Sequence, residues 1–262
     1  MRARAILSLA LLAASGPAFA GAWTLPKGKG DVIITAIGTQ ANQSFDHGWV
    51  AHKTPRYRKL DLSALIEYGA TDDLTTIVLP GLQHIDIAAP FDAARTGLGY
   101  TEFGGRYRLL HGKDWVFSTQ GTMRIPGTTD TGNPAAVGYT FPEFDARALF
   151  GKSFKAGGMP AFVDLQLAQR FRGGGAPNEF RADATFGLQT GQRWLLLAQM
   201  FNVVSEGPGS ALFPSYNYSK VELSAVYSID PLWAVQFGGI STVFGRNALQ
   251  ENGFVVGLWR HF

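Results

Sequence analysis

The chain has 262 residues with no cysteine, 32 glycines and 13% aromatic residues, and its 23 Lys and Arg nearly balance its 20 Asp and Glu. This balance argues against a basic nucleic-acid-binding protein, and the lack of cysteine excludes a disulfide framework. After the first 20 residues, no apolar run reaches the roughly 18 residues that a transmembrane helix needs.

Residues 1–20 have the three parts of a secretory signal peptide. Arg2 and Arg4 form the positive part, AILSLALLAA the apolar part, and AFA the cleavage site at its end. We therefore expect an exported protein that is cut after Ala20. The mature chain then has a net charge of +1, from 21 Lys and Arg against 20 Asp and Glu.

From Gly30 onward, apolar and polar residues alternate with period two, which is typical of β-strands. In KLDLSALIEYGA, residues 59–70, every even position from Leu60 to Tyr68 is apolar, whereas the odd positions are mostly polar, with Leu65 as the exception. The pattern predicts twelve strands, at about residues 30–39, 59–70, 74–87, 100–110, 114–124, 143–151, 162–172, 180–189, 193–205, 220–229, 232–244 and 253–262.

The segments between these strands alternate between short and long, as in outer-membrane barrels. An apolar face suits lipid contact, and strands can cross lipid only in a closed barrel, where every backbone group is paired. We therefore predict one all-β domain over residues 21–262. It is a transmembrane antiparallel up-and-down β-barrel of about twelve strands in the outer membrane, with short periplasmic turns and longer extracellular loops.

The polar face of the predicted strands carries charges of both signs in near balance, as expected for a barrel lumen in which neighbouring strands stack opposite charges. The predicted lumen-lining residues are Lys59, Asp61, Glu67, His84, Glu102, Arg106, Arg108, Arg124, Asp145, Arg147, Asp164, Arg170, Arg172, Arg181, Asp183, Lys220 and Glu222.

The last predicted strand, GFVVGLWRHF, runs to the final residue, with Val256, Leu258 and Phe262 on the lipid side. Its terminal aromatic residue resembles the signal read by the bacterial barrel-assembly machinery, which is therefore an expected partner. One departure is Arg260, at a position where that signal usually has an aromatic or apolar residue.

Five blocks, GAWTLPKGKGDVIIT, GLGYTEFGGRYRLL, RWLLLAQMFN, LSAVYSI and GRNALQENGFVVGLWRHF, resemble the XagA-like outer-membrane proteins. They resemble more loosely the barrels grouped as the MetA-pathway of phenol degradation. The resemblance implies a Gram-negative outer-membrane protein connected with transport of small, often hydrophobic compounds or with surface attachment. It brings no catalytic residues.

One group of residues has the chemistry of an acyl-transfer site. Asp61, Ser63 and His84 supply a carboxylate, a hydroxyl and an imidazole, and a tight hairpin would place Asp61 opposite His84. A structural Asp–His pair in a charged lumen is the simpler interpretation. The remaining histidines lack metal-ligand spacing, so we expect no enzyme, metal or cofactor.

The segment AHKTPRYRKL is basic and lies beside the first long loop. Its Lys53, Arg56 and Arg58 could contact the phosphates of lipopolysaccharide, or they could form an ordinary solvated rim.

Three functions are compatible with the sequence. The first is a narrow channel or transporter for small solutes, including hydrophobic ones. The second is a surface-attachment or envelope-biogenesis protein in which the barrel is an anchor. The third, with the least support, is an outer-membrane lipid hydrolase.

Overall fold

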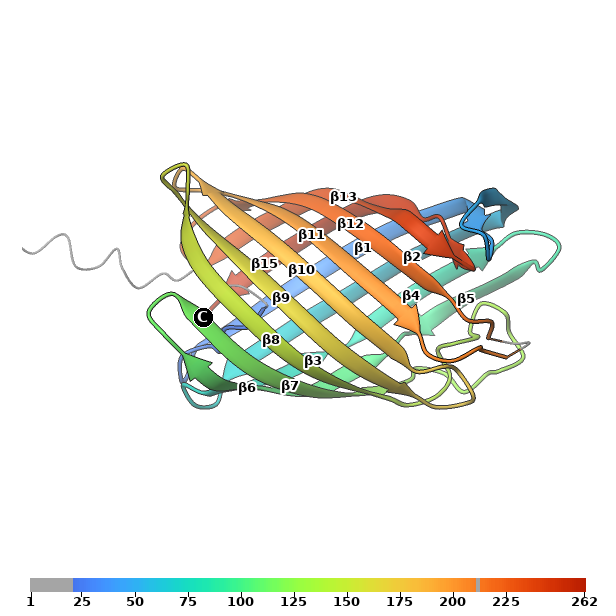
Figure 1. Ribbon diagram of the computed structural model, residues 1–262, viewed down its shortest axis with the longest axis horizontal. Helices are drawn as coiled ribbons and strands as arrows, with labels where there is room; N and C mark the ends of the chain where they lie inside the picture. Colours follow the sequence, from blue (N-terminus) through green and yellow to red (C-terminus); the bar gives the residue numbers. More distant parts are fainter. Residues whose placement is uncertain (1–20, 211–212) are drawn as a thin grey trace, which may run out of the picture.

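The computed structural model describes residues 21–210 and 213–262, and the predicted signal peptide, residues 1–20, lies outside them. No described residue belongs to a helix long and apolar enough to cross a membrane. The chain winds into one barrel (Figure 1). Its strands are β1 (Gly30–Phe45), β2 (Ala51–Gly69), β3 (Leu74–Leu79), β4 (Gly81–Ile87), β5 (Ala93–Leu98), β6 (Thr101–His111), β7 (Trp115–Ile125), β8 (Glu143–Ala156), β9 (Met159–Arg172), β10 (Glu179–Thr190), β11 (Trp194–Ser205), β12 (Asn217–Ser228), β13 (Trp233–Arg246), β14 (Ala248–Leu249) and β15 (Asn252–His261).

The strands form one closed antiparallel sheet, because β1 pairs with β2 on one side and with β15 on the other. β3 and β4 both pair with β2 and act as one wall strand, interrupted at Pro80, which has no N–H to donate. β5 and β6 likewise continue each other across residues 99–100, and β14 is a two-residue extension beside β1. The barrel therefore has twelve wall strands, as predicted.

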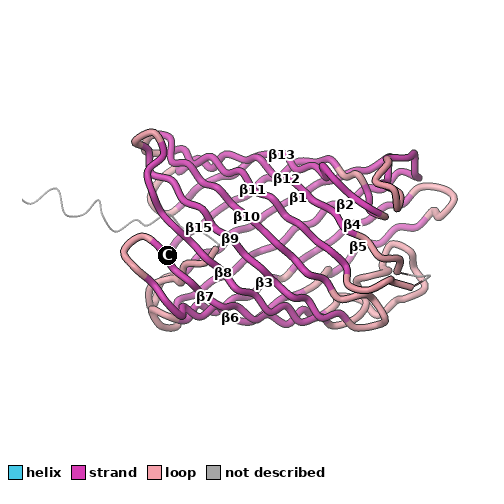
Figure 2. Tube along the Cα trace, in the orientation of Figure 1, coloured by secondary structure: helices cyan, strands magenta, loops and turns pink. Residues whose placement is uncertain are grey.

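Short turns and longer connections lie at opposite ends of the barrel (Figure 2). The turns at residues 112–114 and 157–158 lie at the end that also holds the C-terminus, whereas residues 126–142 and 173–178 lie at the other end. We call these the short-turn end and the long-loop end. At the short-turn end the last residue closes the sheet, since Gly30 N donates to Phe262 O at 3.0 Å.

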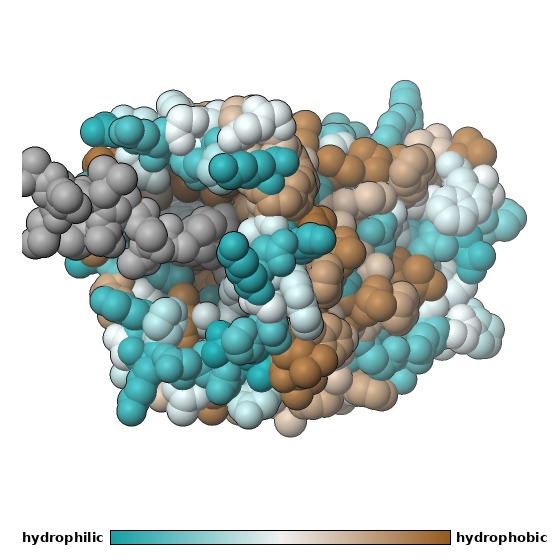
Figure 3. All heavy atoms as spheres, turned by 60° about the vertical axis from the view of Figure 1, so that its left-hand side comes forward, coloured by the Kyte–Doolittle hydropathy of each residue, from teal (hydrophilic) through white to brown (hydrophobic). Residues whose placement is uncertain are grey.

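The two faces of the wall differ as the alternation predicts. On β2, Leu60 and Leu62 point outward and are 46% and 43% exposed, whereas Glu67 points inward and is buried. On the face shown in Figure 3, hydrophobic side chains gather in a band across the middle of the barrel, with mostly hydrophilic ones toward the ends. An apolar band of this kind is the surface that a barrel presents to lipid.

Aromatic residues border this band at the short-turn end. Trp194 packs against Tyr227 with ring centroids 4.8 Å apart, and the guanidinium of Arg260 lies 4.9 Å from the ring centre of Trp233. Amphipathic rings favour the membrane–water interface, and an arginine there can reach water.

Candidate functional site: the barrel lumen

Most residues predicted to line the lumen do point inward. The inward-pointing members of that set are Lys59, Asp61, Glu67, Glu102, Arg106, Arg108, Arg124, Asp145, Arg147, Asp164, Arg170, Arg172, Arg181, Asp183, Lys220 and Glu222. His84 is different, because its side chain lies on the outer face of β4.

The position of His84 corrects the prediction and separates the suggested acyl-transfer group. The hairpin is centred on Asp72, so Asp61 pairs with Gln83, and His84 pairs with Leu60. Asp61 accepts a hydrogen bond from Gln83 Nε2 at 2.7 Å, while His84 Nδ1 contacts Thr96 Oγ1 at 2.7 Å. A shift of one residue moves a side chain to the opposite face of a sheet, so Ser63 and His84 cannot act on one substrate.

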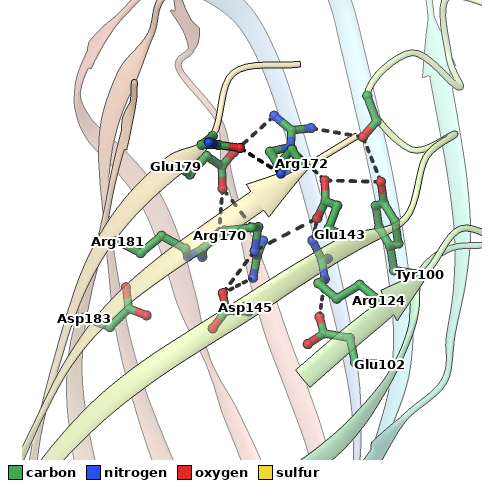
Figure 4. Close-up of polar contacts among 12 residues, drawn as sticks. Tyr100, Glu102, Arg124, Glu143, Asp145, Arg170, Arg172, Glu179, Arg181 and Asp183 are labelled. Carbon is green, nitrogen blue, oxygen red and sulfur yellow. Dashed lines mark hydrogen bonds and ion pairs between the residues drawn. The ribbon is translucent and has the colours of Figure 1, made fainter. Parts of the chain in front are cut away.

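A network of ion pairs covers the lumen side of β6 to β10 toward the long-loop end (Figure 4). Arg124 bridges Glu102, at 2.6 Å, and Glu143. Arg172 continues the network, with its Nε 2.7 Å from Glu143 and its Nη1 3.4 Å from Glu179. Each carboxylate thus joins neighbouring strands.

The same network extends deeper along this wall. Arg170 contacts Asp145 at 3.1 Å, and Arg147 reaches Asp145 at 3.2 Å and Asp183 at 2.9 Å. Buried charges are tolerated only when they are paired and hydrogen-bonded, as these are. Two polar atoms, Arg181 Nε and Asp183 Oδ1, have no hydrogen-bond partner among the described residues. They are groups to which water or a polar solute could bind.

The lumen wall opposite this network is apolar at the short-turn end. Ile33, Leu195, Leu197, Val226 and Trp259 belong to one buried cluster there, and Leu65 packs against it. Leu65 is the residue that broke the polar alternation in the sequence, and its inward position explains why it is apolar. The lumen therefore has a charged wall and an apolar wall.

The segment before β1 enters the lumen at the short-turn end, which the sequence did not predict. Ala22 is fully buried, its N–H donates to Asp164 Oδ2 at 2.6 Å, and its carbonyl accepts from Ser118 Oγ at 2.6 Å. The ring of Trp23 lies edge-on to Phe162, 6.0 Å between centroids. We call residues 21–25 the N-terminal plug.

Two inward groups hold the plug further. Arg106 Nη1 donates to the carbonyl of Trp23 at 2.7 Å, while its Nη2 pairs with buried Glu67. Thr75 Oγ1 accepts from the N–H of Leu25 at 2.8 Å. The plug is thus bound to lumen side chains by individual hydrogen bonds and by the apolar packing of Ala22 and Trp23, and it is not a strand of the wall.

The long connection between β7 and β8, residues 126–142, covers the lumen from the other end. Ala136 in this loop is fully buried, and the carbonyl of Gly138 accepts from Arg172 Nη2 at 3.1 Å and from the Tyr100 hydroxyl at 3.2 Å. The arginine network therefore also anchors the loop, and the lumen is covered at both ends.

The described residues include no group of three or more His, Asp or Glu side chains that could hold a metal ion. The polar chemistry of the lumen is that of arginine guanidinium groups and carboxylates, which bind and orient polar solutes.

Solved structures of outer-membrane proteins have this architecture. The COG4313 outer membrane channel from Pseudomonas putida F1 superposes with a TM-score of 0.74 at 13% identity, covering 92% of this chain and 98% of the channel. This chain has the fold of an outer-membrane β-barrel. The β domain of the Bordetella autotransporter BrkA has a TM-score of 0.54 at 12% identity, covering 90% of this chain and all of that domain. The NanC porin has a TM-score of 0.50 at 8% identity, covering 86% of this chain and 98% of the porin.

No protein-family model matches the sequence, and no curated protein matches it. The resemblance to the XagA-like proteins therefore stays a prediction. The wider expectation of an outer-membrane barrel is confirmed by the fold and by these structures.

Proposed function

We propose that this protein is a gated channel that admits small solutes across the outer membrane, and that the N-terminal plug and the loop 126–142 close it in the state described. The observation that carries the proposal is the way the plug is held. The plug is held by single hydrogen bonds with the side chains of Asp164, Ser118 and Arg106 and by the packing of Trp23 against buried apolar residues, so it can leave without breaking the strand pairing of the wall.

We include hydrophobic compounds among the solutes. The apolar wall around Leu197, Val226 and Trp259 offers an inner surface on which such a compound can bind, beside the charged wall.

The wall lacks strand pairing beside β5. The β6–β7 pairing ends at Thr101 and Ile125, and within the described residues β5 has β4 as its only strand neighbour. Because no backbone hydrogen bonds join β5 to a second strand, the wall can open there more easily than elsewhere. The COG4313 protein, whose barrel this chain resembles in fold, is named as a channel.

Purified protein in planar bilayers tests the proposal. The full mature chain should give small conductance steps, and a variant lacking residues 21–25 should give larger ones. Both should migrate as compact, heat-modifiable bands, which shows that the wall has formed. Electrical silence of the shortened variant across many insertions would refute the channel.

The alternative is a barrel that anchors surface loops for attachment or envelope biogenesis. The covered lumen favours it, because Ala22 and Ala136 are buried at the two ends. An anchor predicts that removing the plug leaves the protein electrically silent, so the same experiment separates the two functions.

Two partners belong to this proposal. Phe262, the terminal aromatic residue directly after β15, is the residue through which we expect the barrel-assembly machinery to bind. Basic residues near the long-loop end, Lys53, Arg56 and Arg58, support contact with the phosphates of lipopolysaccharide.

A further inference from the structure

A groove of about 660 Å³ crosses the outward face of β4, β2, β1 and β15 near the long-loop end. Leu60 and Phe254 line its apolar part. The ring of Phe254 lies over Gly38, since a Cβ at Gly38 would come within 2.5 Å of it. The groove lies outside the lumen, so it takes no part in the solute path.

The other part of the groove is polar. Arg58 lies opposite Asp86 in the sheet, but Asp86 is 3.6 Å from Arg56, and Arg58 forms no ion pair with any described residue. His84 also lines the groove, and its contact with Thr96 uses Nδ1, which leaves Nε2 available. An unpaired guanidinium beside an imidazole is suited to bind a phosphate.

The level of the groove in the membrane restricts its ligand. On β2 the outward side chains run from Tyr68 through Ile66 and Leu62 to Leu60, and then change to Arg58 and Arg56. The groove therefore spans the outer edge of the apolar band, where lipid headgroups meet acyl chains. The apolar part of the groove lies toward the membrane interior and the cationic part toward the long-loop end. A phosphorylated lipid of the outer leaflet presents its acyl chains and its headgroup in the same order.

We propose that this groove is a binding site for the lipid A part of lipopolysaccharide. Arg58 contacts a phosphate, Arg56 is held beside it by Asp86, and an acyl chain lies over Leu60 and Phe254. The proposal rests on the placement of the barrel in the outer membrane and not on transport, so an electrically silent protein would leave it unaffected.

Binding of defined lipids to the detergent-solubilised protein tests the site. Bisphosphorylated lipid A should bind at least tenfold more tightly than dephosphorylated lipid A, since a charge-assisted contact is worth roughly 1.5–3 kcal/mol. Arg58→Ala should lose about tenfold in affinity for the phosphorylated form. Lys152→Ala, which removes an outward charge at the short-turn end, should bind as the wild type does.

Two further arms separate the possible ligands. Gly38→Leu displaces the ring of Phe254 and so disturbs the apolar part of the groove without changing its charge. It should also weaken lipid A binding, whereas a site for phosphate alone would be unaffected. Millimolar inorganic phosphate should not displace lipid A. The proposal is overturned if Arg58→Ala and Gly38→Leu, both folded by the heat-modifiable band, bind lipid A like the wild type, or if inorganic phosphate competes fully.

Discussion

Replacing Leu62 by arginine should destabilise the barrel by about 2–4 kcal/mol, the cost of placing an arginine on the lipid face near the bilayer midplane. Leu62 is 43% exposed on the outward face, and its cross-strand neighbours are Ala36 and Leu82, neither of which can pair with a cation. On the same face, Tyr68 at the short-turn end is six residues away and Arg58 at the outer edge of the apolar band is four residues away, or about 20 Å and about 13 Å along the strand at roughly 3.3 Å per residue. The new guanidinium therefore starts inside the apolar band, away from both interfaces.

Urea titration of the protein refolded in lipid vesicles measures this cost, with the heat-modifiable band as the readout of folding. Leu62→Met is the matched control, because it keeps a long side chain without charge and should cost less than about 1.5 kcal/mol. The reasoning is refuted if Leu62→Arg and Leu62→Met have the same midpoint, since Leu62 would then not face lipid.

Two other predictions concern the lumen and the enzyme alternative. Arg172→Ala should shift the reversal potential toward cation selectivity, because Glu143 and Glu179 lose a shared counter-charge. Glu143→Gln should shift the reversal potential in the opposite direction. Equal reversal potentials in the two variants would contradict this prediction. Ser63→Ala and His84→Ala should leave any lipid hydrolysis by the preparation unchanged, because the two side chains lie on opposite faces of the wall. A phospholipase activity abolished by either variant would show that these residues do form a catalytic site.

The wall of the barrel could be predicted because period-two alternation is a local property of the sequence. KLDLSALIEYGA places Leu60 and Leu62 outward and Glu67 inward, as the structure does. The sequence predicts one strand over residues 74–87, whereas the structure has two, β3 and β4, separated at Pro80. The alternation does not reveal this interruption, because β3 and β4 keep the same register with β2.

The contents of the lumen were less predictable, because they depend on contacts between distant segments. Residues 21–25 have no periodicity, and their partners Asp164 and Ser118 are far away in sequence. An aromatic residue in a segment without strand pattern, Trp23, was the one available signal. His84 was misplaced for a different reason, since its face depends on the centre of a hairpin, and an error of one residue reverses it.

The central claim is that the N-terminal plug closes a channel, and a reversible cross-link tests it most directly. A Cβ at Gly21 would lie 3.0 Å from Asp164 Cγ, so cysteines at these two positions are within disulfide reach, and the chain has no other cysteine. The double variant Gly21→Cys/Asp164→Cys, refolded as residues 21–262, should be silent in planar bilayers when oxidised. After reduction it should conduct more than the wild type, because the carboxylate that accepts from Ala22 is gone. Equal conductance of the oxidised and reduced forms, with the cross-link verified by mass, would contradict the account.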